Sequence, residues 1–160
     1  MITIDDGGYT KIAVDLLTKY KMYATIFLIT SRFNPQTYYV TDYIELHSHS
    51  HNLHNPGVCP GEQGSAIKCL PRKALIEDLK KSRELLNNTT AFCYPFYEYN
   101  EYSTNILKEA GFTMAFIGEV KANYGYKLAE VNSDKYHIPR FVIFDYTSIT
   151  DLKKFINEIK

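Results

Sequence analysis

The alternation of strand-like and helix-like segments is the feature that most constrains how this chain can fold. Short runs rich in β-branched and aromatic residues predict strands at 1–5, 22–29, 43–46, 90–95, 112–117 and 136–144. Apolar residues three or four positions apart predict helices at 9–20, 71–86, 101–111 and 148–160. Such alternation is typical of an α/β fold with parallel strands, and 160 residues fit a single domain, residues 1–160.

Two segments have patterns that predict how they are buried. The run at 22–29 is apolar at nearly every position, which indicates a strand covered on both faces. The first helix carries Ile12, Leu16 and Tyr20 on one face, with Ala13 and Leu17 beside them, the pattern of an amphipathic helix whose apolar side packs on the core.

Charge and hydropathy argue against several classes of partner. The formal net charge is zero and the pI is near 7.0, so no basic surface for nucleic acid or an acidic membrane is expected. No apolar run approaches the length of a membrane-spanning helix, and the first residues lack the pattern of a signal peptide.

The cysteines are three, Cys59, Cys69 and Cys93. An odd and small number is not typical of a disulfide scaffold, and no C-x-x-C pair is present for a zinc ribbon. The sequence therefore favours free thiols, with a bridge between Cys59 and Cys69 as the less favoured alternative.

Polar segments follow three of the predicted strands directly. These are Asp5-Asp6, the histidine-rich stretch "HSHSHNLH" at 47–54, and "YPFYE" at 94–98. Because the carboxyl ends of parallel strands lie at one edge of the sheet, we expect these segments to converge there.

The histidine-rich stretch holds four of the five histidines, His47, His49, His51 and His54. Two imidazoles with one carboxylate are a common ligand set for a catalytic Zn²⁺. From the residues alone the pair stays open: His47 with His51 are four residues apart, and His49 with His54 are five. The alternative is a polar loop.

The adjacent carboxylates of Asp5 and Asp6 also indicate a cation, because two negative charges at one strand end repel each other. Neighbouring side chains of a strand point to opposite sides, so one Asp can bind the metal while the other faces a water. The alternative is an Asp that caps the following helix.

Three motifs resemble those of the polysaccharide deacetylases, the NodB-homology domain of family 4 carbohydrate esterases. Residues 3–7, "TIDDG", are similar to T-F-D-D-G, and Ser48-His49-Ser50 with His54 fits S-H-[ST] followed by a second histidine. Residues 93–97, "CYPFY", resemble the third motif, R-P-P-[YF]-G, which is often "AYP[FY]G" in the poly-N-acetylglucosamine deacetylase branch. The resemblance covers residues 2 to about 145.

The resemblance implies a deformed (β/α) barrel, complete or incomplete, and a metal-dependent removal of N-acetyl groups from a polysaccharide such as poly-N-acetylglucosamine, peptidoglycan or a chitin-like polymer. It implies that Asp5 is the general base and that Asp6, His49 and His54 bind the metal, usually Zn²⁺, with Co²⁺, Ni²⁺ or Fe in some members. The backbone N–H of Phe96 would help to hold the oxyanion. The expected partner is the acetylated polysaccharide.

The third motif departs from the family pattern at both ends. Cys93 stands where the family has arginine, so we expect Arg140 of "IPRF" to orient Asp5, the alternative being a surface arginine. Tyr97 stands where the family has glycine. We expect Tyr94, Pro95 and Tyr97, together with Phe96, to line the substrate groove.

The histidine that protonates the leaving amine in the family, in an L-x-H motif, has no counterpart here. In the poly-N-acetylglucosamine branch a comparable histidine precedes the D-D-G strand, so the chain can be read as lacking an N-terminal segment. His47, His51 and His137 are the substitutes to consider, and each is favoured as structural.

Three readings of function therefore stay open. The first is an active de-N-acetylase, the second an impaired or non-catalytic relative that keeps the metal and binds glycan, and the third an O-acetyl xylan esterase. Family members usually act on extracellular or cell-wall polymers, while these residues carry no export signal, so localisation and oligomeric state stay open.

Overall fold

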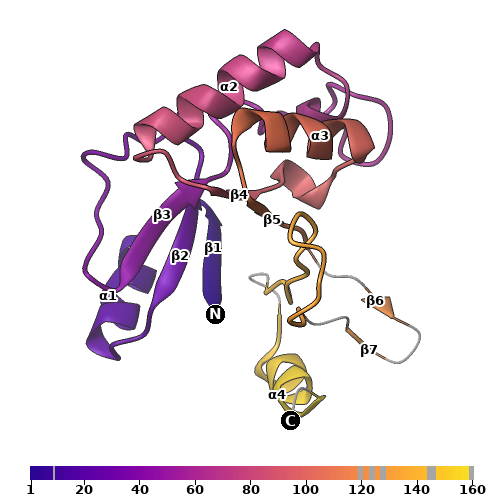
Figure 1. Ribbon diagram of the computed structural model, residues 1–160. Coiled ribbons are helices and arrows are strands. Elements are labelled where there is room, and N and C mark those ends of the chain that lie inside the picture. Colours follow the sequence, from indigo (N-terminus) through magenta and orange to yellow (C-terminus); the bar gives the residue numbers. More distant parts are fainter. Residues whose placement is uncertain (9, 119–120, 123–124, 127–128, 144–146, 159–160) are drawn as a thin grey trace.

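The sheet at the centre of the molecule has five parallel strands (Figure 1). A computed structural model of the protein describes residues 1–8, 10–118, 121–122, 125–126, 129–143 and 147–158. The strands are β1 (Ile2–Asp6), β2 (Ala24–Leu28), β3 (Ile44–Ser48), β4 (Ala91–Cys93) and β5 (Met114–Phe116). They lie in the order β1-β2-β3-β4-β5. Each new strand is thus added on the same side of the last, which is the winding of a barrel, and the sheet forms a curled half-barrel.

In the described part of the chain, four α-helices accompany the strands. They are α1 (Lys11–Lys19), α2 (Arg72–Leu85), α3 (Glu101–Ala110) and α4 (Ile149–Glu158). Two short 3₁₀ helices, η1 (Ala66–Lys68) and η2 (Pro95–Tyr97), and an antiparallel hairpin of β6 (Lys121–Ala122) and β7 (Gly125–Tyr126) complete the elements. In Figure 1, α2 and α3 lie side by side over the β4–β5 end of the sheet. Among the described residues, no helix has the length and apolar character needed to cross a bilayer.

The register of the strands brings their polar ends to one level. Asp6 of β1 pairs with Leu28 of β2, Leu28 pairs with Ser48 of β3, and Ser48 pairs with Phe92 of β4. Residues that follow these positions therefore emerge at the same rim. As expected for a strand covered on both faces, all five residues of β2 are buried.

The larger part of the core lies between the sheet and the α2–α3 pair. Leu75 and Leu79 of α2 pack with Leu107 of α3 and with Phe92 of β4. Helix α3 begins at a capping box, because the Asn100 side chain accepts from the Ser103 N–H while the Ser103 hydroxyl accepts from the Asn100 N–H. This cap and the core together fix the chain that leaves β4.

The expected buried face of the first helix is wrong for three of its residues, while Leu17, beside them, is buried. Ile12, Leu16 and Tyr20 are exposed, and Val14 and Leu17 are the buried residues of α1. The helix is apolar on two sides, and only the packing of Val14 and Leu17 against β1 and β2 selects one of them.

The strand expected at 136–144 is also wrong for the residues that the structure describes, while Phe144 lies outside them. A single parallel bridge joins Phe116 to Ile138, and the Arg140 N–H donates to the Gly118 carbonyl. Pro139 lies between these two contacts and has no N–H to donate, which limits a continuous ladder.

The expectation of free thiols is wrong for two of the three cysteines. Cys59 and Cys69 form a disulfide, whereas Cys93 is free and buried. The loop that carries these cysteines folds back on itself between residues 57 and 64. The Gly57 N–H donates to the Gln63 carbonyl, and the Val58 N–H donates to the Gly64 carbonyl. This turn brings the two cysteine Cα atoms to 5.7 Å, which spacing along the sequence does not reveal.

Candidate active site

Asp6, His49 and His54 converge at the carboxyl rim of the sheet. Asp6 Oδ1 lies 3.2 Å from His49 Nε2 and 3.1 Å from His54 Nε2, and the centroids of the two imidazole rings are 4.9 Å apart. The Phe96 ring, from the segment after β4, lies 4.2 Å from the His54 ring. The predicted convergence of the three polar segments is therefore present.

The three side chains fit a divalent cation. Their ligand atoms all lie within 4.8 Å of one another, and Asp6 Oδ1 is buried without a hydrogen-bond partner among the described residues. His49 Nδ1 donates to the Cys93 carbonyl at 2.8 Å, which leaves Nε2 as the free ligand atom. One carboxylate with two imidazoles is a ligand set that suits Zn²⁺.

The protonation equilibria show that this site attracts positive charge. Burial works to lower the pKa of His49, but the interactions with Cys93, Asp6 and Asp5 outweigh it and raise that pKa well above its usual value. Burial and the nearby His49 lower the pKa of His54. The neighbouring His49 imidazole, whose Nε2 lies 3.2 Å from Oδ1, holds the pKa of Asp6 below its ordinary range, despite partial burial. A metal would neutralise the same negative groups, and it competes with protons for the imidazoles.

The structure separates the histidines that their spacing alone left open. His47 Nδ1 pairs with Thr89 Oγ1, and His51 Nδ1 pairs with Thr30 Oγ1 at 3.0 Å. Neither belongs to the ligand cluster. His137, the third substitute considered for a general acid, lies between Asp134 and Thr104, to which its ring nitrogens are bonded at 2.8 and 3.1 Å.

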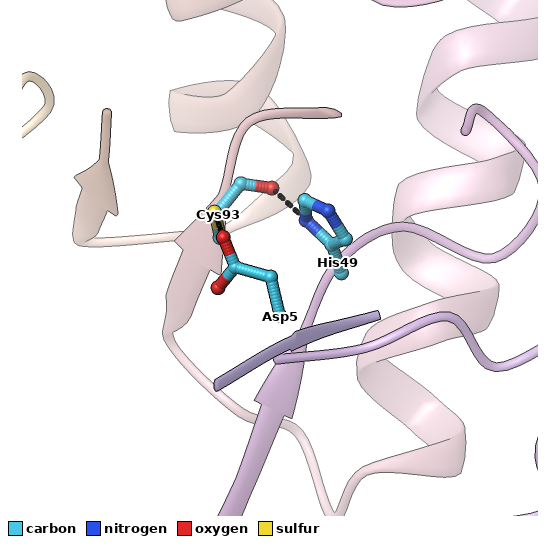
Figure 2. Close-up of side chains that lie close together, drawn as sticks. All are labelled: Asp5, His49 and Cys93. Atoms are coloured by element: carbon cyan, nitrogen blue, oxygen red, sulfur yellow. Dashed lines mark hydrogen bonds between the residues drawn. The ribbon is translucent and has the colours of Figure 1, made fainter. Parts of the chain in front are cut away.

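Asp5 lies beside this cluster and is held by Arg140. The guanidinium donates to both carboxylate oxygens, each at 2.8 Å, so the expected contact between Arg140 and Asp5 is present. The Cys93 thiol lies 3.4 Å from Asp5 Oδ2 (Figure 2). It also lies 2.9 Å from Arg140 Nη2. Burial works to raise the pKa of Asp5, but Arg140 and His49 outweigh it, so the carboxyl titrates below its ordinary value.

A second group of potential ligands, Asp5, His49 and Cys93, is less suited to a metal (Figure 2). The Arg140 guanidinium already occupies both oxygens of Asp5 and repels a second cation. Burial, followed by Asp5, raises the pKa of Cys93, which keeps the thiol protonated and able to donate to that carboxylate.

Replacing Arg140 by methionine is expected to destabilise the protein by about 3–5 kcal/mol, because the largely buried Asp5 carboxylate loses its charge partner. Thermal or urea unfolding measures this change. The lowered pKa of Asp5 means that its stabilising contribution is present above about pH 3.8 and is lost as the pH falls further, so the difference from wild type should shrink in acid.

The Asp5→Asn/Arg140→Met variant supplies the control for this prediction. Removing both charges should recover part of the lost stability. An Arg140→Met protein as stable as wild type at neutral pH would show that the ion pair contributes nothing.

The turn of the third motif has an unusual backbone. Phe96 and Tyr97 have φ values of 58° and 59°, in the left-handed region that residues other than glycine rarely adopt. The Tyr97 ring lies 5.5 Å from the Arg140 guanidinium and packs on Gly118, where an added Cβ would be 2.7 Å from it. Tyr97 therefore faces Asp5 and Arg140, and burial together with Asp5 raises the pKa of its phenol.

The expected groove lining is wrong for Tyr94 and Pro95. Both are buried, and the Tyr94 side chain has no exposed surface. Its hydroxyl pairs with Thr104 at 3.2 Å in the core against α3. The sequence does not predict the direction of the Tyr94 side chain, because that direction depends on how α3 covers β4.

Three residues of the site region were missed from the sequence. Cys93 was noted only as a replacement, Glu98 follows the third motif directly, and Asp78 sits in a helix without any distinguishing pattern. Glu98 is buried and accepts from the N–H groups of Gln63 and Ser65, at 2.6 and 2.8 Å, so it ties the disulfide-closed loop to this motif. The position of Glu98 directly after the third motif was the one sequence feature that could have indicated its role.

Comparison with known proteins identifies the family. The family model described as polysaccharide deacetylase matches residues 1–115. The chain belongs to the polysaccharide deacetylase family. It is 28% identical over 165 residues to a poly-beta-1,6-N-acetyl-D-glucosamine N-deacetylase of Staphylococcus aureus. The match covers 90% of this chain and 54% of the relative, so the chain spans about half the length of the curated relatives it matches.

Solved structures of polysaccharide deacetylases share the fold. A de-N-acetylase from Aggregatibacter actinomycetemcomitans superposes with a TM-score of 0.73 at 18% identity, over 96% of this chain and 73% of that one. A family 4 pseudoenzyme from Bacillus anthracis superposes with a TM-score of 0.52 at 18% identity, over 71% of this chain and 41% of that one. The deacetylase fold therefore carries both active and inactive proteins.

Proposed function

We propose that this chain carries the catalytic centre of a metal-dependent de-N-acetylase that acts on a polysaccharide containing N-acetylglucosamine. The observation that carries the proposal is the Asp6–His49–His54 cluster with Asp5 beside it, held by Arg140. The family membership and the S. aureus relative, an N-deacetylase of poly-beta-1,6-N-acetyl-D-glucosamine, favour an N-acetylated glycan over an O-acetylated xylan. The Cys59–Cys69 disulfide is compatible with work in an oxidising compartment.

Each residue then has a defined role. When bound by Asp6, His49 and His54, a divalent metal lowers the pKa of water and polarises a carbonyl. Asp5 accepts the proton of the attacking water, and its lowered pKa keeps it ionised for that task. Arg140 fixes the orientation of Asp5 through both oxygens. The Phe96 N–H would donate to the oxygen on which negative charge develops.

A non-catalytic glycan-binding relative is the second candidate. One observation favours it: among the described residues, His47, His51 and His137 do not belong to the Asp6–His49–His54 cluster, and each bonds to a threonine through one ring nitrogen. A missing general acid costs about 10²–10⁴ in rate.

Acetate release from N-acetylglucosamine oligomers, measured with and without added Zn²⁺, tests the proposal. We expect release that stops when the metal is chelated and resumes when Zn²⁺ is restored. A protein that binds Zn²⁺ and oligomers but releases no acetate would establish the second candidate. A protein that neither binds Zn²⁺ nor releases acetate would overturn both.

A further inference from the structure

The loop between the two histidine ligands depends on a carboxylate outside it. Strand β3 ends at Ser48, so the N–H groups of His51 and Asn52 lie beyond the sheet. They donate to the two oxygens of Asp78, at 2.8 and 2.7 Å respectively. A carboxylate that accepts two backbone N–H groups in this way forms strong, charge-assisted hydrogen bonds.

Helix α2 attaches the loop at two points. Asp78 and Ser82 are four residues apart and therefore lie on one face of the helix. The Ser82 hydroxyl pairs with that of Ser48 at 2.6 Å, next to the first ligand, and Asp78 holds the middle of the loop. Burial raises the pKa of Asp78, although the His51 and Asn52 N–H groups oppose the shift.

The loop has one residue in a strained backbone conformation, and the N–H groups of Thr30 and Ser31 donate to its Ser50 and His51 carbonyls. Ser50 has a φ of 72°, in the left-handed region. Its N–H donates to the Ser48 hydroxyl, and its own hydroxyl accepts from the Leu53 N–H, both at 3.1 Å. These local contacts shape the turn, whereas Asp78 joins it to the rigid body of α2.

We propose that Asp78 is a positioning residue for the metal site, which fixes the 51–52 backbone so that His49 and His54 face Asp6 before the metal binds. This inference rests on the proposed metal site. Without Asp78, the loop populates the ligand-competent conformation for less of the time, and the apparent metal affinity falls by that fraction. Loss of a group that orients metal ligands typically weakens binding by about 10–100-fold.

The test is the Zn²⁺ affinity of Asp78→Ala, measured by competition with a chromophoric chelator. Glu77→Ala is the matched control, because Glu77 is the neighbouring carboxylate on α2 and is exposed. Among the residues that the structure describes, its one ion pair is with Lys73 of the same helix. We expect Zn²⁺ binding to weaken by about 10–100-fold in Asp78→Ala and by less than twofold in Glu77→Ala. The absorption spectrum of the Co²⁺-loaded protein should change in the first variant alone.

Unfolding of the metal-free proteins separates positioning from general stability. An Asp78→Ala protein that is less stable but binds Zn²⁺ as tightly as wild type, with an unchanged Co²⁺ spectrum, would overturn the inference. Asp78→Asn keeps the shape of the side chain and one acceptor oxygen, so we expect a Zn²⁺ affinity between those of wild type and Asp78→Ala. If Asp78→Ala fails to fold, the Zn²⁺ affinity and Co²⁺ spectrum of Asp78→Asn decide the question in the same way. A wild-type protein that binds no Zn²⁺ would instead overturn the proposed function.

Discussion

Substituting both His49 and His54 by alanine is expected to abolish Zn²⁺ binding. In the Asp6–His49–His54 cluster, the nitrogen ligands are the two Nε2 atoms that lie beside Asp6 Oδ1. Without them the cluster keeps one carboxylate, which is a poor site for zinc. We expect about one equivalent of Zn²⁺ in the wild-type protein and less than a tenth of that in the variant, measured by elemental analysis after dialysis.

A matched control removes the same number of histidines from the same stretch. His47→Ala/His51→Ala takes away the two imidazoles that pair with Thr89 and Thr30 rather than with Asp6. This variant should keep its metal. Equal loss of Zn²⁺ from both double variants would show that the whole stretch binds metal without the specific geometry of Asp6, His49 and His54.

Changing Asp5 to asparagine is expected to lower the rate of acetate release by about 10²–10⁴ while the protein keeps its metal. Asparagine preserves the shape of the side chain and one acceptor for Arg140, but it cannot take a proton from water. The experiment compares initial rates and Zn²⁺ content for the wild type and the variant at equal protein concentration.

Asp15→Asn is the control for this substitution. Asp15 is an exposed aspartate of α1 that pairs with Lys11 and has no proposed part in the reaction. The rate of acetate release should therefore stay within twofold of wild type. Undiminished acetate release by Asp5→Asn would remove Asp5 from the role of general base.

At the third motif, the sequence predicts the position of the segment but not the direction of its side chains. The segment directly follows a strand, as expected, and its backbone is left-handed at Phe96. The motif letters do not state which side chains of the segment face solvent. Tyr94 enters the core and Tyr97 turns toward Asp5 because α3 covers one side of β4 and Arg140 lies on the other.

Arg140 illustrates a contact that the sequence could suggest but not decide. It lies 135 residues from Asp5, and the loss of the motif arginine at Cys93 gave the only reason to look for a replacement. The bridge between Phe116 and Ile138 sets the segment against β5, and this pairing carries the guanidinium to the rim.

The sequence by itself determined the alternation of strands and helices, the parallel sheet and the three segments at its carboxyl rim. These follow from local periodicity and from the rule that parallel strands end at one edge. Spacing left the histidine pair open, and the motif resemblance implied His49 and His54. Only the tertiary structure decided which face of α1 is buried, that Cys59 meets Cys69, and that Asp78 holds the ligand loop. Those choices depend on contacts between residues far apart in the chain, and neither periodicity nor spacing encodes such contacts.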